Sequence, residues 1–351
     1  MRSKSMRLTE DPACSEVAHR IVASGVAPLA AGGFATSKHG IFAGGSVETI
    51  FDLASLTKPM TAVAVARSSL SRHEKLGDVL PETKGTASDD ATIELLLSHR
   101  AGLEPHVKLW LRENMQNTSI LREAADARRA DAKGPYPEEG FAPVYSDLGY
   151  LLAGAALARR VNAVDAGAAI DDLVVVPLGL EKDLGTARDF EARGIDVIAR
   201  SAPTEDAPWR GGMVQGRVHD ENAWAITKEG GSGHAGMFGT IAGVLAFGLH
   251  VLENANAYDW LVRARPGGSL RAGFDGKSDA GSSAGTVCGP RTFGHLGFTG
   301  TSLWIDPESE IVVALLTNRV HPSRENTAIR EARPEAHDAL FRAAKMLGSS
   351  A

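Results

Sequence analysis

The sequence predicts a mixed α/β (α+β) protein, with strands near both ends of the chain and helices through its middle. Residues 28–42 place apolar residues on either side of a Lys-His-Gly turn, which is typical of a β-hairpin. Two further strands are expected at 298–305 and 311–317, joined by a polar turn. Between these ends, residues 71–240 have mainly the pattern of helices and loops.

Helices are predicted from apolar spacing and from their end signals. Asp147 stands directly before an apolar segment, the position of an N-cap residue, and would hold the preceding loop rigidly. The predicted helical segments are residues 14–24, 92–99, 110–132, 148–157, 241–252 and 334–347.

The composition is that of an ordinary globular protein, with 43% apolar and 23% charged residues. A net charge of -6 and the lack of any Lys/Arg block argue against a nucleic-acid-binding surface. Cys14 and Cys288 have neither zinc-site nor CxxC spacing, so free thiols are expected, with a single disulfide as the alternative. No apolar run reaches the 18 residues that a membrane-spanning helix needs.

The N-terminal residues 1–8 are basic, but the polar stretch 9–12 follows them instead of an apolar segment. This pattern lacks the features of a signal peptide, and a cytoplasmic location is therefore expected, unless translation starts upstream.

The strongest chemical signal is Ser55-x-x-Lys58, followed by the Ala-rich run 61–66. A helix starting near Ser55 would put the two side chains on one face, one turn apart. The serine hydroxyl would then lie at the positive end of the helix dipole, beside an amine. Desolvation would lower the pKa of Lys58, so that its amine could accept the serine proton.

A metal hydrolase using His219, Asp220 and His234 is a weaker alternative, because nothing resembling HExxH is present. His99 and His106 lack a local ligand cluster and are expected to be structural or surface residues. The glycine-rich stretch 230–239 lacks the lysine of a phosphate loop. No metal or cofactor is therefore expected.

Three ordered motifs support a family resemblance: Ser55-x-x-Lys58, Tyr145-Ser146-Asp147 and His295-Leu296-Gly297. With these motifs the chain resembles the class C β-lactamase-related serine hydrolases, which include penicillin-binding proteins and esterases. The likeness extends from about Pro28 to Ala344. The stretches 219–223, 297–302 and 316–322 look closest to N-acetylmuramoyl-L-alanine amidase-like members.

The resemblance implies a β-lactamase/transpeptidase-like fold, in which an antiparallel sheet built from both chain ends is flanked by helices. Residues 1–351 would form a single domain. Its mixed sheet and helix part would comprise residues 28–60 and 265–347, and its inserted, mainly helical part residues 65–250. The active site would lie between the two parts.

The implied mechanism is acyl transfer, with Ser55 as the nucleophile. Lys58 and Tyr145 would share proton transfer, and the sequence leaves open which of them is the base. The backbone N–H groups of Ser55 and of Phe298, just after Gly297, would form an oxyanion hole.

His295 occupies the place where many relatives have lysine, and it would donate a hydrogen bond or titrate near neutrality. Two residues depart from the family pattern. Asp147 stands where β-lactamases usually have asparagine, and Leu296 stands where most relatives have a small or hydroxyl-bearing residue. Both substitutions argue against β-lactamase activity.

The sequence therefore predicts a serine hydrolase acting on an amide or ester of a small-molecule or peptide-like substrate, with a cell-wall-derived muropeptide as the class that the resemblance favours. One alternative is a carboxylesterase with incidental β-lactam turnover. Another is a non-catalytic penicillin-binding-like protein, although Ser55, Lys58 and Tyr145 are all present. No nucleic-acid or membrane partner is expected, and the sequence does not indicate an oligomeric state.

Overall fold

The main sheet has seven strands in the order β1-β3-β2-β12-β11-β10-β9. It is described here from a computed structural model that covers residues 8–112 and 117–349. β1 runs parallel to β3, and every other neighbouring pair is antiparallel. The strands are β1 (Leu8–Glu10), β2 (Ala30–Thr36), β3 (Gly40–Gly45), β9 (Asp275–Gly276), β10 (Phe293–Leu296), β11 (Ser302–Asp306) and β12 (Ile311–Thr317).

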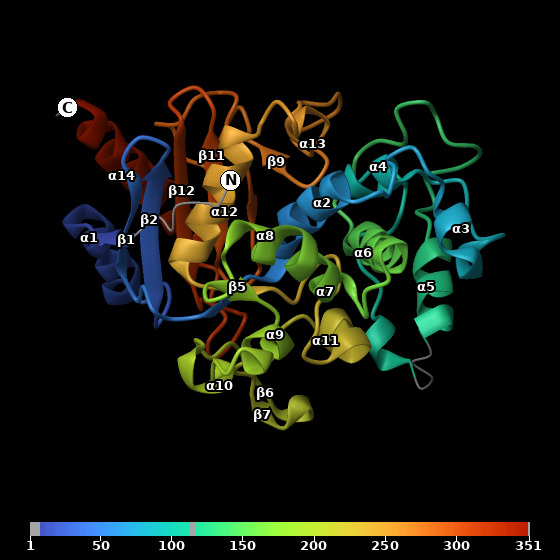
Figure 1. Cartoon of the computed structure of the whole chain (residues 1–351), viewed down its shortest axis with the longest axis horizontal. Coiled ribbons are helices and arrows are strands. Elements are labelled where there is room, and N and C mark those ends of the chain that lie inside the picture. Colours follow the sequence, from blue (N-terminus) through green and yellow to red (C-terminus); the bar gives the residue numbers. More distant parts are fainter. Residues whose placement is uncertain (1–7, 113–116, 350–351) are drawn as a thin grey trace.

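Both ends of the chain meet in this sheet, because β2 of the N-terminal hairpin pairs with β12 along its whole length. Alternate residues of a strand face opposite sides. Val313 and Leu315 accordingly pack with α1 (Pro12–Ala23) and α14 (Ile329–Ser349). Val312 and Leu316 belong to the main core, which also contains residues of α12 (Ile241–Glu253). Helices therefore cover both faces of the sheet (Figure 1).

The second part of the molecule is mainly helical and lies beside the sheet (Figure 1). Its central helices are α2 (Thr57–Arg67) and α6 (Asp147–Val161), which pack against each other. The other helices are α3 (Leu76–Val79), α4 (Ile93–Leu97), α5 (Asn117–Asp126), α7 (Ala166–Ile170), α8 (Val176–Leu178), α9 (Ala187–Ala192), α10 (Val197–Arg200), α11 (Glu221–Thr227) and α13 (Asp259–Val262).

Two small sheets complete the fold. One joins β4 (Phe51–Asp52), β8 (Phe238–Gly239) and β5 (Leu184–Gly185), with β8 in the centre. The other pairs β6 (Asp206–Ala207) with β7 (Gly212–Met213). Because β4 ends shortly before Ser55, the first of these sheets ties the nucleophile segment to the glycine-rich stretch before α12.

The β-lactamase-like fold class predicted from the sequence is confirmed, and several element boundaries are corrected. The helix expected at 110–132 is limited to α5 and follows a 3₁₀ turn at 109–111, while residues 113–116 lie outside the described chain. The short strands β1, β9 and β10 were not predicted. α12 packs on the sheet, although the sequence-based division assigns residues up to 250 to the helical part.

Two other expectations concern covalent and membrane features. Cys14 and Cys288 are both buried and free, which confirms the prediction of free thiols. Across residues 8–112 and 117–349, no helix is both long and apolar enough to cross a membrane.

Candidate active site

Ser55 lies in a single 3₁₀ turn, Ala54–Leu56, immediately before α2. Ala54 has a positive φ of 47°, a conformation that costs a non-glycine residue about 1–3 kcal/mol and persists where neighbours enforce it. Here Asp52 enforces it. Its buried carboxylate accepts hydrogen bonds from the N–H of Ala54 at 2.8 Å and of His219 at 2.7 Å. The Asp52 side chain of β4 therefore fixes the backbone of the segment that carries Ser55.

Lys58 is completely buried one helical turn from Ser55. Its Nζ donates to Ser55 Oγ at 2.8 Å and to the backbone oxygen of His234 at 3.2 Å. It also forms an ion pair with Asp147 Oδ1 at 2.7 Å. An ammonium has three N–H donors, and each of these contacts can take one.

The charge of Lys58 differs from the sequence-based expectation. Burial alone would lower the pKa of Lys58, but the carboxylate of Asp147 and the hydroxyl of Tyr145 raise it above its usual value. The prediction of a depressed lysine pKa is therefore wrong. It failed because the sequence does not show that a carboxylate lies within 2.7 Å of the amine.

Asp147 is the first residue of α6, and the N-cap is Ser146. The prediction of an Asp147 N-cap is wrong, because its carboxylate turns toward Lys58 instead of the helix end. Burial would raise the pKa of Asp147, but the Lys58 ammonium holds it far below its usual range. His106 Nδ1 lies 3.8 Å from the other carboxylate oxygen, and this contact raises the pKa of His106. A chain of polar side chains therefore runs from Lys58 through Asp147 to His106.

Tyr145 is held by aromatic neighbours above the lysine. Its ring stacks on His99 with centroids 4.8 Å apart, and Lys58 Nζ lies 4.9 Å from the ring centroid. His99 Nδ1 accepts a hydrogen bond from the N–H of Ser146 at 3.0 Å, which fixes the imidazole. Burial lowers the pKa of His99 to about 3, so it is a neutral platform. Desolvation also raises the pKa of Tyr145, while the positive charge of Lys58 opposes that rise.

His295 ends β10 and faces the Tyr145 ring, with centroids 5.9 Å apart. Its Nδ1 lies 2.8 Å from the backbone oxygen of Leu296, so the N–H of the neutral ring donates there. Burial and then the charge of Lys58 lower the pKa of His295 to about 3. The suggestion that His295 titrates near neutrality is therefore wrong. It overlooked that this position is 4% exposed.

Gly297 and Phe298 form the turn after β10. A Cβ at Gly297 would collide with Thr301 and would come within 2.6 Å of the Leu53 backbone oxygen, so only glycine fits. Among the described residues, the backbone N–H groups of Ser55 and Phe298 have no hydrogen-bond partner. Both are free to donate to a substrate oxygen.

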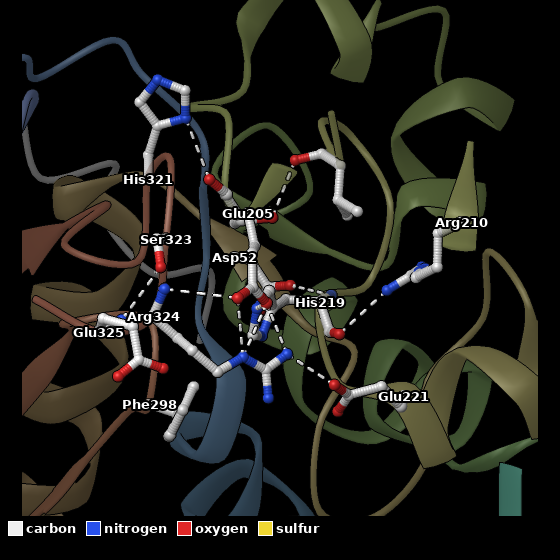
Figure 2. A network of polar contacts seen from close by, with 12 residues as sticks. Asp52, Glu205, Arg210, His219, Glu221, Phe298, His321, Ser323, Arg324 and Glu325 are labelled. Atoms are coloured by element: carbon white, nitrogen blue, oxygen red, sulfur yellow. Dashed lines mark hydrogen bonds and ion pairs between the residues drawn. The ribbon is translucent and has the colours of Figure 1, made fainter. Parts of the chain in front are cut away.

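A network of polar side chains lies beside Phe298 (Figure 2). The ring stacks on His219 with centroids 5.7 Å apart. His219 Nε2 lies 3.1 Å from Glu205, and Arg324 Nε donates to both Glu205 oxygens at 2.8 Å. Arg324 Nη2 also donates a hydrogen bond to Glu221 Oε1 at 2.6 Å. Burial would raise the pKa of Glu205, but His219 and Arg324 hold it well below its usual range.

These residues surround a cavity of about 530 Å³. Of the predicted site residues, the buried Lys58 contacts Ser55 without lining the cavity, and the others line it: Ser55, Tyr145, Asp147, His295, Gly297 and Phe298. The cavity also has lining residues that the sequence did not single out as active-site residues, and only their spatial position reveals them: His106, Glu221, Arg319, Arg324, Arg330 and Arg333.

The residues of the metal alternative separate into two pairs. His234 Nε2 lies 2.9 Å from Asp220, and His219 contacts Glu205. No group of three or more His, Cys, Asp or Glu suited to a metal occurs in the part of the chain that the structure describes.

Comparisons with known proteins agree with this architecture. A sequence model of the family described as Beta-lactamase matches residues 20–337. A protein of Salmonella agona (strain SL483), provisionally named a D-alanyl-D-alanine carboxypeptidase, is 25% identical over an alignment of 319 residues, covering 81% of this chain and 72% of that protein.

Two solved structures share the fold. The class C beta lactamase from Rhodobacter sphaeroides has a TM-score of 0.68 at 15% identity, covering 95% of this chain and 100% of that one. EstCE1, described as a hydrolase with promiscuous acyltransferase activity, has a TM-score of 0.69 at 20% identity, with coverages of 94% and 97%.

Proposed function

The chain belongs to the beta-lactamase family of serine hydrolases, and from this premise we propose that it cleaves an amide or ester through an acyl-enzyme on Ser55. The observation that carries the proposal is the position of Lys58. Its Nζ contacts Ser55 Oγ at 2.8 Å while Asp147, at 2.7 Å, keeps it charged. A buried ammonium beside a hydroxyl oxygen stabilises negative charge that develops on that oxygen during attack.

The same geometry supports Tyr145 as the group that moves protons. Because Lys58 donates to Ser55 Oγ, the serine hydroxyl must donate its own proton elsewhere, and Tyr145 lines the same cavity with its ring over Lys58. As Oγ bonds to the carbonyl carbon, its proton passes to the Tyr145 oxygen, and the phenolic proton passes to the leaving group as the bond to that group breaks. In deacylation, water takes the place of the leaving group, and both transfers run in reverse.

The oxyanion of each tetrahedral intermediate would accept hydrogen bonds from the N–H groups of Ser55 and Phe298. Removing one donor of an oxyanion hole typically costs about 10²–10³ in kcat. The stacking of Phe298 on His219 supports this role, because it fixes the second donor.

Two substrate classes have support. The similarity to the Salmonella protein favours a peptide-like amide, with a muropeptide fragment as the substrate class that the amidase-like motifs suggest. An ester is the second candidate. It is favoured by Leu296, which offers no hydrogen bond where relatives bind β-lactams. A panel of muropeptides, D-alanyl-D-alanine peptides, 4-nitrophenyl esters and a cephalosporin reporter distinguishes these classes by their relative kcat/KM.

The nucleophile is tested independently of the substrate. A fluorophosphonate probe should add once to the parent protein and not at all to Ser55→Ala, as measured by intact mass. Ser323→Ala is a suitable control, because this exposed serine lies near the cavity but outside the catalytic group. Equal labelling of Ser55→Ala and the parent would refute the assignment.

A further inference from the structure

The glycine-rich stretch 230–239 contains a tight turn that packs against α6. The N–H of Ser232 donates to the backbone oxygen of Ala235 at 2.9 Å, so Gly233 and His234 are the two central residues of this turn. A Cβ at Gly233 would collide with the backbone oxygen of Tyr150 in α6, so only glycine fits there. Because glycine permits many backbone conformations, the orientation of the turn depends on a further restraint.

The side chain of His234 provides such a restraint. It is 1% exposed, and both of its ring nitrogens have a partner. Nε2 lies 2.9 Å from Asp220 Oδ1, and Nδ1 lies 3.0 Å from Ser232 Oγ. Burial would raise the pKa of Asp220, but His234 holds it below its usual value, so this group is a carboxylate that only accepts. Nε2 therefore donates to Asp220, which is also the N-cap of α11. The ring is thus fixed between a helix start and the turn itself.

The backbone of the same residue contacts the lysine of the site. The His234 oxygen accepts a hydrogen bond from Lys58 Nζ at 3.2 Å. Further along α2, Thr61 Oγ1 donates to the Gly233 oxygen at 2.7 Å, so the turn is attached to the helix that carries the lysine. The His234 oxygen completes the three acceptors of the ammonium, together with the two side-chain acceptors described above. Displacing one acceptor frees an N–H group and allows the ammonium to rotate.

We propose that His234 is a positioning residue of the acylation reaction. Its imidazole, fixed between Ser232 and Asp220, orients the backbone oxygen that keeps the Lys58 ammonium directed toward Ser55 Oγ. The proposal rests on the serine hydrolase function proposed above and adds a residue that acts through Lys58. It also gives a role to two of the residues that the sequence suggested for a metal site, because the structure brings His234 and Asp220 together as a hydrogen-bonded pair.

The test follows the reaction of Ser55 with a fluorophosphonate, in which Oγ displaces fluoride from phosphorus, so the natural substrate need not be known. Labelling at several probe concentrations gives a first-order constant, kinact, and an apparent affinity, KI. His234→Gln keeps a donor for Asp220 but loses the contact with Ser232, and Ser232→Ala removes the same contact by a smaller change. Both variants should lower kinact by about ten- to a hundredfold, the usual effect of a small misplacement. KI should stay nearly unchanged, because neither side chain lines the active-site cavity.

The charge of Lys58 provides a readout that separates positioning from a loss of folding. Burial lowers the pKa of Lys58, but Asp147 and Tyr145 raise it above its usual value. His99 and His295 also face the lysine, and both are neutral because burial lowers their pKa to about 3. The protonation of the amine is therefore controlled by the acceptors around it, of which the turn supplies one.

A hydrogen-bond acceptor stabilises the charged form of an amine, so displacing the His234 oxygen should lower the pKa of Lys58. The proposed reaction needs the ammonium. The alkaline limb of the pH profile of kinact should therefore move to lower pH by about one unit in His234→Gln and in Ser232→Ala. In a variant that was only less stable, less protein would be labelled, but kinact and its pH profile would remain those of the parent.

Two further variants serve as controls. His337→Gln is matched to His234→Gln, because His337 is also fully buried and its Nε2 lies 2.8 Å from a serine hydroxyl, that of Ser302, but it lies outside the active-site cavity. It should lower stability without changing kinact or its pH profile. Ser232→Thr keeps the hydroxyl, and its methyl group has room in the separate cavity of about 410 Å³ that Ser232 lines, so it should restore most of kinact.

The possible outcomes distinguish this proposal from the proposed function. If the parent is labelled at Ser55 and the pH profiles of His234→Gln and Ser232→Ala coincide with that of the parent, the positioning role is refuted while the nucleophile stands. An equal shift in His337→Gln would attribute the effect to the loss of any buried histidine and would also refute it. If the parent itself is not labelled at Ser55, the serine hydrolase proposal fails, and the positioning role fails with it.

Discussion

Replacing Asp147 by asparagine, the residue that β-lactamases usually have at this position, removes the negative charge that pairs with Lys58. The side chains change little in size, but the ion pair at 2.7 Å becomes a hydrogen bond to a neutral amide. With an effective dielectric constant of about 20, Coulomb's law gives the pair about 6 kcal/mol of attraction. Desolvation of the fully buried Lys58 offsets part of this.

Removing one partner of a buried pair typically costs about 3–5 kcal/mol, because the other charge is left uncompensated. The asparagine oxygen still accepts a hydrogen bond, so Asp147→Asn should lower the free energy of unfolding at pH 7 by about 3 kcal/mol, the lower end of that range. Urea denaturation followed by circular dichroism measures this difference.

The pH dependence gives the sign of the effect. The pKa of Asp147 is lowered in the folded protein, so its contribution is complete above its unfolded pKa of about 3.9 and declines as the pH falls below it. The pKa of Lys58 is raised, so its contribution is complete below its unfolded pKa of about 10.4 and is lost as the pH rises through its folded pKa. The stability gap between parent and Asp147→Asn should therefore be constant from about pH 5 to 9 and narrow toward pH 3.

A matched surface pair provides the control. Lys75 and Asp90 are similarly close, at 2.8 Å, but their side chains are 54% and 72% exposed. Asp90→Asn should change stability little, because solvent screens an exposed pair. The reasoning is refuted if Asp147→Asn unfolds at the same urea concentration as the parent at pH 7, or if its deficit is unchanged at pH 3.

Two further predictions concern the proposed chemistry. Lys58→Ala and Tyr145→Phe should each lower kcat by about two to four orders of magnitude. The double variant should be little slower than either single one, because groups that act as a unit are non-additive; strict additivity would separate them. Gly297→Ala should lower kcat by about 10²–10³, because the added methyl group would meet Thr301 and Leu53 and displace the Phe298 N–H; unchanged kcat would exclude that donor.

The parts of the fold that the sequence predicts are those with a local pattern. The hairpin of β2 and β3 and the pair β11 and β12 combine apolar runs with recognisable turns. β9 has two residues and lies within a glycine- and serine-rich connection, and β10 has four residues and follows it. Their pairing therefore depends on contacts between residues that are distant in sequence.

The site shows the same division. The motif spacing indicates Ser55 and Lys58, the family resemblance indicates Tyr145, and the structure brings the three together. The charge on Lys58 was misjudged because it depends on Asp147, which the sequence placed at a helix cap. Arg333 carries no motif at all. Its burial beside the cavity follows from the packing of α14 against the turn after β10, which no local sequence pattern shows.

The charged side chains on the two sides of the cavity differ in whether an opposite charge neutralises them. On the helical side, Asp147 neutralises Lys58, so this pair contributes little net charge to attract a substrate. Its ammonium acts at short range on Ser55 Oγ, at 2.8 Å. On the sheet side, Arg319 and Arg333 line the cavity, and among residues 8–112 and 117–349 neither forms an ion pair with a carboxylate. The binding of a charged substrate should therefore depend on ionic strength, whereas proton transfer, confined to the buried pair of Lys58 and Asp147 and to Tyr145, should not.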